Sequence, residues 1–351
     1  MGGAEVFTRE VAKRWVQRGH EVTLFTSEFP GCRREEILEG VNVVRRGGRF
    51  SVYLWARRFY RQRFLKEGFD VVVDEINTLP FFMPSLMGNS VKIAALIHQL
   101  AREYWFYETP FPVSHLGYRF LEDRWLRQYV DVPTITVSES TRQDLLALGF
   151  KRVFVVTEGL SFKPWSRVPK KESFPVTVYV GRLKKAKRPD HAIRAFDIVR
   201  EKFPRAELWI IGDGSFKDDL KKMAGEGVSF FDDLSNTQRR NLLKKAWVLI
   251  NPSVREGFGL NVVEANALGT PCVAYDVAGL RDSVKDNETG LLADSGSVGD
   301  LASKICSVLE DGSLRLGLSR RALDYSRQFS WSKASEAFLR VLDECHSSVE
   351  L

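Results

Sequence analysis

Short apolar runs of strand length alternate with helical segments along the whole chain, and this alternation limits the fold more than any other feature. The first series of apolar runs lies at residues 21–26, 70–73, 92–97, 134–137 and 153–156. A second series lies at residues 176–180, 207–211, 228–231, 248–250 and 271–275. Strands that alternate with helices form parallel sheets covered on both faces. We therefore predict an α/β protein with two doubly wound, Rossmann-like domains.

A proline-rich segment separates the two series. Residues 163–175 contain three prolines and four basic residues and show no periodicity, as is typical of a linker. The chain, with 351 residues, is long enough for two domains. We predict an N-terminal domain at residues 1–165 and a C-terminal domain at residues 166–330. Ligands of doubly wound sheets bind beyond the carboxyl ends of the strands, so we expect a site in a central cleft that the two domains face.

The composition excludes several classes of protein. Apolar residues make up 44% and charged residues 28% of the chain, as in ordinary soluble globular proteins. No apolar run approaches the roughly 18 residues needed to span a bilayer, and the first residues lack the pattern of a signal peptide. The four cysteines are scattered without the spacing of a zinc site. We expect reduced thiols, a cytoplasmic location, no metal centre and no nucleic-acid partner.

Basic residues gather in one segment. Between Arg45 and Lys66 the sequence has eight basic residues and no acidic residue. Without those eight, the 52 Lys and Arg residues become 44, against 45 Asp and Glu, so the rest of the chain is close to neutral. Residues 53–66 are predicted to form a helix with Arg57 and Arg61 on one side and aromatic residues nearly opposite. The segment is either a core helix with a solvated basic face or a peripheral docking surface for the anionic headgroups of a membrane.

Two glutamates flank a predicted helix start. Residues 254–264 read VREGFGLNVVE, so that Glu256 lies on a glycine-containing turn and Glu264 about one turn into an apolar helix. The N-terminus of a helix presents unpaired backbone N–H groups, which attract anions. An anion pocket between two carboxylates that bind hydroxyl groups suits a sugar joined to a phosphate.

A basic run follows the first strand of the second domain. Five of the seven residues from Arg182 to Arg188 are basic, directly after Gly181. Such a run is either a solvated loop or a phosphate site. Because Arg182 lies at the strand end and Lys187 five residues later, a guanidinium and an ammonium group can converge on a diphosphate. We predict a phosphate site that uses these cations and no metal.

Two pairs of glycines also follow the pattern of ligand-binding turns. Gly212 and Gly214 come after the next strand, where they either make a tight turn or form a wall for a nucleotide base. Gly2 and Gly3 open the first predicted helix, where the chain is either disordered or brings backbone N–H groups against a phosphate.

Polar residues at the strand ends of the first domain are further candidates. His98 follows the strand at 92–97 and is either structural or functional. Glu75 and Asn77 leave another strand end, where they either bind a polar acceptor or form a capped turn. Glu103 and Trp105 lie in an aromatic loop, which is either a platform for stacking a sugar or a buried anchor.

Taken together, these residues resemble the family 4 glycosyltransferases, which are retaining enzymes of the GT-B fold. The resemblance covers most of the chain and rests on motifs that follow the family's order and spacing. These motifs are Gly2-Gly3-Ala4-Glu5, Arg18-Gly19-His20-Glu21-Val22, Gly181-Arg182-Leu183 with Lys187, Gly212-Asp213-Gly214, Pro252-Ser253, Glu256-Gly257-Phe258-Gly259 with Glu264, Thr289-Gly290-Leu291-Leu292, and Phe329-Ser330-Trp331.

The resemblance implies that the C-terminal domain binds a nucleotide-sugar and the N-terminal domain an acceptor, and that a helix within residues 331–351 crosses back to the N-terminal domain. It also implies a reaction. A hexose would pass from a UDP- or GDP-sugar to a hydroxyl group of a glycan or a lipid-linked acceptor, with retention of the anomeric configuration and without a cofactor or a metal.

The resemblance further implies a role for each matched residue. Arg182 and Lys187 would bind the donor diphosphate, Glu256 the hydroxyls of the donor sugar and Glu264 the ribose. His98 would contact the donor sugar near the reacting carbon. Backbone N–H groups that bind sugar and phosphate would come from Phe258, Gly259 and Leu260.

The chain departs from the family pattern in three places. Members carry a strand before the Gly-Gly turn, and this chain begins at that turn. We therefore expect an N-terminal domain without its first strand and with two unpaired sheet edges. Thr157-Glu158-Gly159-Leu160 stands where an Asn-Gly-Val-Asp-like segment is common, and Asp232 stands where a glycine is expected near the base.

Other activities remain open at this stage. A glycosidase would use the two glutamates as acid and nucleophile, but it has no phosphate to bind at Arg182 and Lys187. A sugar-nucleotide epimerase of the same fold would share that phosphate site. So would a non-catalytic scaffold that binds nucleotide-sugars.

Overall fold

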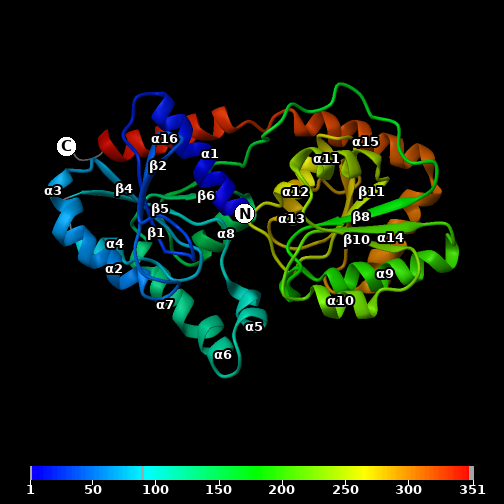
Figure 1. The fold of residues 1–351 in the computed structure, drawn as a ribbon, viewed down its shortest axis with the longest axis horizontal. Helices are drawn as coiled ribbons and strands as arrows, with labels where there is room; N and C mark the ends of the chain where they lie inside the picture. Colours follow the sequence, from blue (N-terminus) through cyan, green and yellow to red (C-terminus); the bar gives the residue numbers. More distant parts are fainter. Residues whose placement is uncertain (1, 88–90, 348–351) are drawn as a thin grey trace. The chain divides into compact units, whose positions relative to one another are not determined.

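A computed structural model describes residues 2–87 and 91–347, and the chain divides into two compact units (Figure 1). Unit 1 contains Met1–Ala101, Arg119–Gly159 and Ser330–Leu351, and unit 2 contains Arg102–Tyr118 and Leu160–Phe329. The prediction from the sequence assigned residues 102–118 to the N-terminal domain, whereas the structure groups them with unit 2. The C-terminal helix belongs to unit 1.

Unit 2 is built on one six-stranded parallel sheet. Its strands are β8 (Val176–Val180), β9 (Glu207–Ile211), β10 (Val228–Phe231), β11 (Val248–Asn251), β12 (Cys272–Tyr275) and β13 (Gly290–Ala293). They lie in the order β10-β9-β8-β11-β12-β13, and all neighbours are parallel. The direction of chain progression reverses between β8 and β11, and such a reversal opens a crevice at the carboxyl ends of those two strands.

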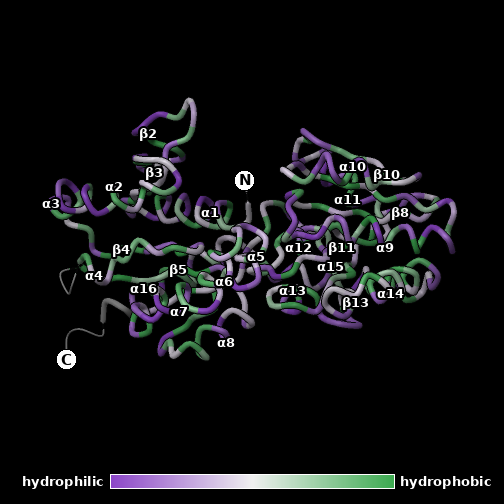
Figure 2. The backbone as a smooth tube through the Cα atoms, turned by 90° about the horizontal axis from the view of Figure 1, so that it is seen from below, coloured by the Kyte–Doolittle hydropathy of each residue, from purple (hydrophilic) through white to green (hydrophobic). Residues whose placement is uncertain are grey.

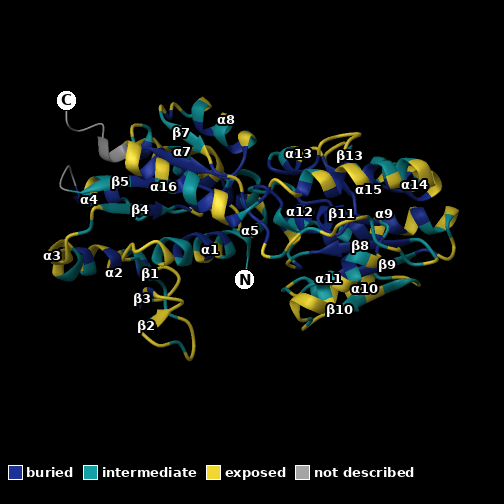
Figure 3. Cartoon of the chain, turned by 90° about the horizontal axis from the view of Figure 1, so that it is seen from above, coloured by how far each residue is buried: buried dark blue, intermediate teal, exposed yellow. Residues whose placement is uncertain are grey.

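Helices cover both faces of this sheet (Figure 1). They are α9 (Pro189–Lys202), α10 (Lys217–Met223), α11 (Asn236–Lys245), α12 (Leu260–Asn266), α13 (Leu280–Ser283), α14 (Val298–Glu310) and α15 (Gly312–Ser326). Apart from the edge strand β10, these strands are largely buried, with Leu208 and Ile250 fully inaccessible, and β8 and β11 are mostly dark blue in Figure 3. Strands with this burial are expected to be continuous apolar runs, which is the pattern in the sequence.

A short helical segment precedes these elements in the chain but belongs to the same unit. It contains the 3-10 turn η2 (Arg102–Tyr104) and the short helices α5 (Trp105–Glu108) and α6 (Val113–Leu116). The π-helical turn η3 (Gly117–Leu121) leads from it back into unit 1.

Unit 1 contains two separate sheets. Strands β1 (Thr23–Thr26), β2 (Glu35–Leu38) and β3 (Val41–Arg45) lie in the order β1-β3-β2. Strands β4 (Val71–Glu75), β5 (Lys92–Leu96), β6 (Thr134–Thr136) and β7 (Val153–Val155) lie in chain order and are parallel. Among the residues that the structure describes, β1 and β4 each have one neighbouring strand. This agrees with the expectation of two unpaired sheet edges.

The helices of unit 1 pack on these sheets. They are α1 (Gly3–Gln17), α2 (Val52–Phe59), η1 (Tyr60–Phe64), α3 (Leu65–Glu67), α4 (Met83–Met87), α7 (Glu122–Leu126), η4 (Arg127–Tyr129), α8 (Glu139–Ala147) and α16 (Trp331–Ser347). The C-terminal helix α16 packs against α1, where the rings of Trp15 and Phe338 lie 5.1 Å apart. Its packing surface includes the apolar strand β5, which is largely green in Figure 2. No helix in residues 2–87 and 91–347 is long and apolar enough to cross a membrane.

The segment between Arg45 and Lys66 is less uniformly basic in the structure than in the sequence. The β2–β3 hairpin, which the sequence did not predict, brings carboxylates to it. Arg45 is buried and pairs with Glu36 at 2.6 Å, while Glu35 pairs with Arg46 at 2.6 Å and with Arg63 at 3.0 Å. The predicted helix does form, as α2, η1 and α3 in succession.

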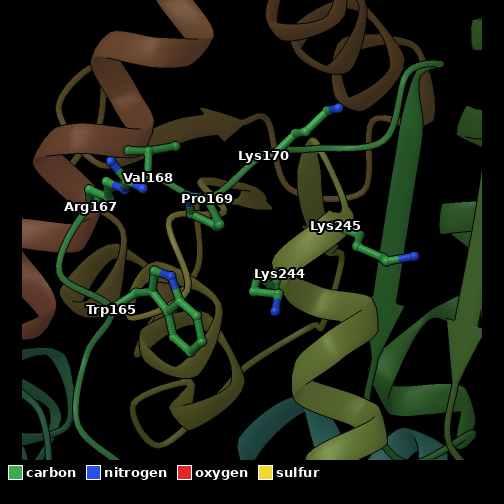
Figure 4. Close-up of a pocket in the computed structure, with 7 residues that line it drawn as sticks. All are labelled: Trp165, Arg167, Val168, Pro169, Lys170, Lys244 and Lys245. Carbon is green, nitrogen blue, oxygen red and sulfur yellow. The ribbon is translucent and has the colours of Figure 1, made fainter.

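The predicted linker packs against unit 2. Trp165 donates its backbone N–H to the Ala267 carbonyl at 2.8 Å. Together with α11, the linker lines an open depression of about 620 Å³ (Figure 4). Its lining residues are Trp165, Arg167, Val168, Pro169, Lys170, Lys244 and Lys245. Because these residues precede β8 and β11 in the chain, the depression lies at the amino ends of the strands, opposite the predicted ligand edge.

Candidate active site

An ion pair between Lys187 and Glu256 is the centre of the candidate site in unit 2. Lys187 ends the 3-10 turn η5 (Lys185–Lys187), which follows β8, and Glu256 lies on the loop between β11 and α12. Lys187 Nζ and Glu256 Oε2 are 2.6 Å apart, and the two side chains are 13% and 15% exposed. Two residues predicted from separate motifs therefore meet at the crevice between β8 and β11.

Neighbouring groups keep Lys187 charged. Burial lowers the pKa of Lys187, but the carboxylate of Glu256 and the hydroxyl of Tyr104 outweigh burial, so the pKa is raised above its ordinary value. The Nζ atom lies 5.6 Å from the centroid of the Tyr104 ring. A buried ammonium group stays protonated where an anion lies beside it, so Lys187 presents a positive charge at the site.

A chain of polar side chains fixes the other oxygen of Glu256. The Ser253 hydroxyl lies 2.9 Å from Glu256 Oε1 and 2.7 Å from Asn251 Oδ1. Asn251 Nδ2 donates to Asn261 Oδ1 at 3.2 Å, and Asn261 Nδ2 donates to the Val180 carbonyl at 2.7 Å. The network joins the carboxyl ends of β8 and β11 to α12, so the orientation of Glu256 is set by the sheet itself.

The backbone of the Glu256 loop is held by close contacts. Glu256 donates its N–H to the Ala278 carbonyl at 3.1 Å, and Val254 donates to the Ala186 carbonyl at 3.1 Å. A Cβ atom at Gly279 would lie 2.1 Å from the Glu256 carbonyl oxygen. Only glycine fits there, because a side chain would push the loop away.

Glu264 lies on α12 and pairs with a residue of α11. Arg239 Nη2 donates to Glu264 Oε1 at 3.1 Å. Burial raises the pKa of Glu264, and Arg239 opposes that effect. The predicted ribose-binding carboxylate is therefore well buried and already bound to one cation.

The turn before α12 supplies the predicted backbone donors. Phe258 is buried against Phe329, with ring centroids 5.4 Å apart. Gly259 is the residue before the helix and has a φ of 93°, and Leu260 is the first helical residue. The N–H groups of Phe258 and Gly259 have no acceptor among the described residues. Their binding to sugar and phosphate stays a prediction.

The Gly212–Gly214 turn has a packing role. A Cβ atom at Gly212 would lie 2.0 Å from the Gly181 carbonyl oxygen, and one at Gly214 would lie 2.4 Å from that of Leu183. The turn therefore packs directly against the start of the basic loop. The sequence left open whether these glycines make a tight turn or form a wall for a nucleotide base. Their close contacts fit a tight turn.

Arg182 differs from the other predicted cations. It is exposed, and its side chain has no hydrogen bond or ion pair with a described residue. Other basic residues of the same loop are paired, since Lys184 lies 3.2 Å from Glu108 and Arg188 donates to the Tyr107 hydroxyl at 3.0 Å. Arg182 is thus available to an anionic ligand, as is the exposed Lys185, which has no carboxylate partner among the described residues and lies over the Phe216 ring.

The segment at residues 102–108 packs on the basic loop. Glu103 pairs with Arg255 at 2.8 Å, and the Tyr104 hydroxyl donates to the Arg255 carbonyl at 3.2 Å. Trp105 is 8% exposed, and a Cβ atom at Gly117 would lie 2.3 Å from its ring. Of the two alternatives for Trp105, the structure therefore favours the buried anchor over the platform for stacking a sugar. The Glu103 carboxylate already forms an ion pair with Arg255.

The candidate residues of unit 1 gather around the start of α1. His98 is 6% exposed and packs edge-on to Phe7, with ring centroids 5.2 Å apart. Its Nε2 atom lies 3.6 Å from Glu75 Oε1, and neither ring nitrogen has a hydrogen-bond partner among the described residues. The Thr8 hydroxyl donates to Glu75 Oε2 at 2.8 Å.

The remaining predicted residues of unit 1 are simple to place. Gly3 is the first residue of α1, and Gly2 donates its N–H to Glu5 Oε2 at 2.7 Å. Asn77 is exposed on the turn after β4. In unit 2, Asp232, which stands where a glycine was expected, forms an ion pair with Lys217. Glu158 is buried.

Sequence reasoning missed several residues of the site. Asn251 and Asn261 had no signal of their own, because a single asparagine is common in turns. Arg239 lies in a polar helix whose partner on α12 is 25 positions away. Ser253 was part of a family motif but carried no assigned role. A polar residue at the end of a buried strand, as at Asn251, is the signal that could have pointed to this network.

Known proteins resemble this chain in sequence and in fold. The D-inositol 3-phosphate glycosyltransferase of Corynebacterium aurimucosum is 33% identical over 191 residues, which are 49% of this chain and 45% of that protein. The chain spans about half the length of the curated relatives it matches.

Two solved structures share the fold. Sucrose-phosphate synthase from Thermosynechococcus elongatus aligns with a TM-score of 0.80 and 18% identity over 99% of this chain and 94% of that chain. Anabaena HepE in complex with UDP-glucose aligns with a TM-score of 0.74 and 15% identity over 98% and 96%. At these identities the likeness shows the fold, which is GT-B as predicted.

Family models match both halves of the chain. The model described as Glycosyltransferase Family 4 matches residues 1–161, and the model described as Glycosyl transferases group 1 matches residues 163–325. The two matches span the motifs that were quoted for both domains, up to Leu292. The chain therefore belongs to the family 4, group 1 glycosyltransferases.

Proposed function

We propose that this protein transfers a hexose from a UDP- or GDP-sugar to an acceptor hydroxyl group, with retention of configuration and without a metal. The observation that carries the proposal is the Lys187–Glu256 pair at the crevice between β8 and β11. It combines a cation suited to a diphosphate with a carboxylate suited to sugar hydroxyls. The D-inositol 3-phosphate glycosyltransferases support glycosyl transfer, and the UDP-glucose complex of HepE supports this class of donor.

Each group has a defined part in this proposal. The donor diphosphate binds Lys187 and the exposed Arg182, which neutralise the charge that develops on the leaving nucleoside diphosphate. Glu256 accepts hydrogen bonds from the hexose, and Glu264 from the ribose. His98 contacts the hexose near the reacting carbon. With two cations and the free N–H groups before α12 at the diphosphate, the reaction needs no metal.

The acceptor is proposed to be a glycan or a lipid-linked molecule. The exposed basic residues of the α2–α3 region support a protein that works at the anionic cytoplasmic face of a membrane. Five of the eight basic residues there have no carboxylate partner among the described residues: Arg49, Arg57, Arg58, Arg61 and Lys66.

A donor screen tests the proposed reaction. The pure protein is incubated with a panel of UDP- and GDP-sugars, with and without lipid and glycan acceptors, and released nucleoside diphosphate is measured. We expect release that depends on one donor and rises with an acceptor. Interconversion of sugar nucleotides would show an epimerase, and tight nucleotide binding without turnover would show a scaffold.

Glu256→Gln separates the sugar role from the phosphate role. The amide keeps the size of the side chain but loses the negative charge, so sugar transfer should fall at least about a hundredfold. Binding of UDP or GDP should stay within about threefold of the unaltered protein, because neither ligand contains the hexose. Calorimetry measures binding, and the donor assay measures transfer. An equal loss of both would contradict the sugar role of Glu256.

A further inference from the structure

Arg239 and Glu264 form a second ion pair in unit 2. Arg239 lies in the first turn of α11, whose start is fixed by a capping box between Ser235 and Gln238. Its Nη2 atom lies 3.1 Å from Glu264 Oε1, and the two side chains are 30% and 12% exposed. The pair therefore joins two helices, α11 and α12, beside the carboxylate that is proposed to bind the ribose.

This pair leaves hydrogen-bonding capacity unused. Arg239 Nε is buried and has no partner among the described residues. Glu264 Oε2 likewise makes no hydrogen bond with a described residue. A buried N–H group without a partner destabilises the protein, so a ligand that accepts from it gains affinity. A hydroxyl group can donate and accept at once, and it matches a free N–H beside a free carboxylate oxygen.

Arg239 also sets the charge of Glu264. Burial raises the pKa of this carboxyl, and Arg239 is the strongest opposing group. Arg240, on the same helix, opposes it more weakly, and its guanidinium lies 4.7 Å from the centroid of the Phe162 ring. These two arginines are the charged groups that act on Glu264 in the described structure. An ionised carboxylate only accepts hydrogen bonds, whereas protonation replaces one acceptor site by an O–H donor.

Resting on the proposed function, we infer that Arg239 is the positioning residue for the nucleotide ribose. It holds one oxygen of Glu264 in place, and its Nε–H together with the other oxygen binds the adjacent 2′ and 3′ hydroxyl groups. The pair thereby distinguishes ribose from deoxyribose. This role belongs to Arg239 and not to its neighbour Arg240, which faces Phe162.

Nucleotide binding as a function of pH tests this inference. Affinities for UDP, GDP and their 2′,3′-dideoxy analogues are measured by calorimetry between pH 5 and pH 9. Arg239→Met should weaken binding of the ribonucleotides about tenfold or more and should nearly remove the preference for ribose. Affinity falls as the pH drops through the pKa of Glu264, and without Arg239 this fall should begin at a higher pH.

Two further variants make the test specific. Arg240→Met removes the same charge from the same helix; it should keep the ribose preference and shift the pH profile less than Arg239→Met does. Arg239→Lys retains the charge but lacks the Nε–H, so it should keep the pH profile and lose most of the preference. Thermal unfolding followed by circular dichroism shows whether Arg239→Met is folded. If Arg239→Met does not fold, Arg239→Lys still tests the ribose preference.

The outcomes are distinguishable. If the unaltered protein binds neither UDP nor GDP at any pH, the proposed function fails, and the role of Arg239 fails with it. If the unaltered protein binds them and Arg239→Met or Arg239→Lys keeps the full ribose preference, only the role of Arg239 is refuted. Equal effects of the Arg239 and Arg240 substitutions would also refute it.

Discussion

Most charged side chains of the candidate site are neutralised by a partner within unit 2. Lys187 pairs with Glu256, and Glu264 pairs with Arg239. Buried ion pairs add little to stability, because losing the solvation of two charges offsets much of their attraction. Their effect here is to hold charged groups in fixed orientations before a ligand arrives. A bound nucleotide-sugar then exchanges these internal contacts for its own phosphates and hydroxyls.

The two proposed phosphate cations can be tested against two others on the same loop. Arg182→Ala with Lys187→Ala should weaken binding of UDP or GDP by about 3 kcal/mol or more, because two charge-assisted contacts are lost. Lys184→Ala with Lys185→Ala removes the same charge, but Lys184 faces Glu108 and Lys185 lies over Phe216. The second pair should therefore change affinity by less than about 1 kcal/mol. Calorimetry compares the two, and equal losses would refute a specific phosphate site.

At the residue scale, the sequence predicted which side chains matter better than how they are arranged. Lys187 and Glu256 were both predicted, from a basic run and from a glutamate motif, but their direct contact spans 69 positions. Such a contact depends on the register of the strands β8 and β11, which residue type does not reveal. For Trp105 the sequence could not decide the role itself, since an aromatic residue in a loop is equally common as a buried anchor and as a platform for a sugar.

Loops in this protein are positioned by the close approach of backbone segments. Through glycines, the turn at Gly212 touches the start of the basic loop, and the turn at Gly279 touches the Glu256 loop. Glycine permits such contacts because it has no Cβ atom. The geometry of the site therefore depends on elements that carry no functional side chain.

Gly279→Ala tests this dependence, with Gly296→Ala as a matched control. Both glycines have a positive φ, 82° and 81°, so both substitutions carry backbone strain. Only at Gly279 would the new Cβ atom meet another group, the Glu256 carbonyl oxygen at 2.1 Å. Gly279→Ala should lose about 1–3 kcal/mol more stability than the control and most of its transfer activity.

Urea unfolding and the donor assay measure these two effects. The Gly296→Ala control has open space around its new methyl group and should keep full activity. Equal destabilisation by both substitutions, or a fully active Gly279→Ala protein, would show that the Glu256 loop tolerates displacement.

At the element scale, buried strands were predictable and polar ones were not. The runs at β8, β9 and β11 are apolar throughout because both faces of the sheet are covered. The β2–β3 hairpin was missed because Glu35–Leu38 is exposed on most of its length and has no apolar run. The grouping of residues 102–118 with unit 2 was also missed, because it depends on contacts such as Glu103–Arg255, which span 152 positions.

Over the whole molecule, positive charge is concentrated on one helical surface of unit 1. The buried residues Val52, Ala56 and Tyr60 recur at helical spacing and face the unit. The opposite face carries Arg57 and Arg61 together with exposed leucines, Leu54 at 71% and Leu65 at 54%. Basic and exposed apolar side chains on one helix face are typical of a surface that rests on anionic lipid headgroups.

Binding to lipid vesicles tests this surface. The protein should bind vesicles that contain anionic lipids and leave vesicles of neutral lipids unbound, since each basic side chain near the surface contributes about 1 kcal/mol. Arg57→Gln with Arg61→Gln should therefore reduce vesicle binding about thirtyfold, while Lys221→Gln with Lys222→Gln on α10 removes the same net charge and should leave binding unchanged. Raising the salt concentration shortens the range of these attractions, so binding should fall steeply with salt. Co-sedimentation of the three proteins with both kinds of vesicle measures these effects. Equal effects of the two double substitutions would assign any binding to net charge, and the α2–α3 surface would then be a solvated helix face.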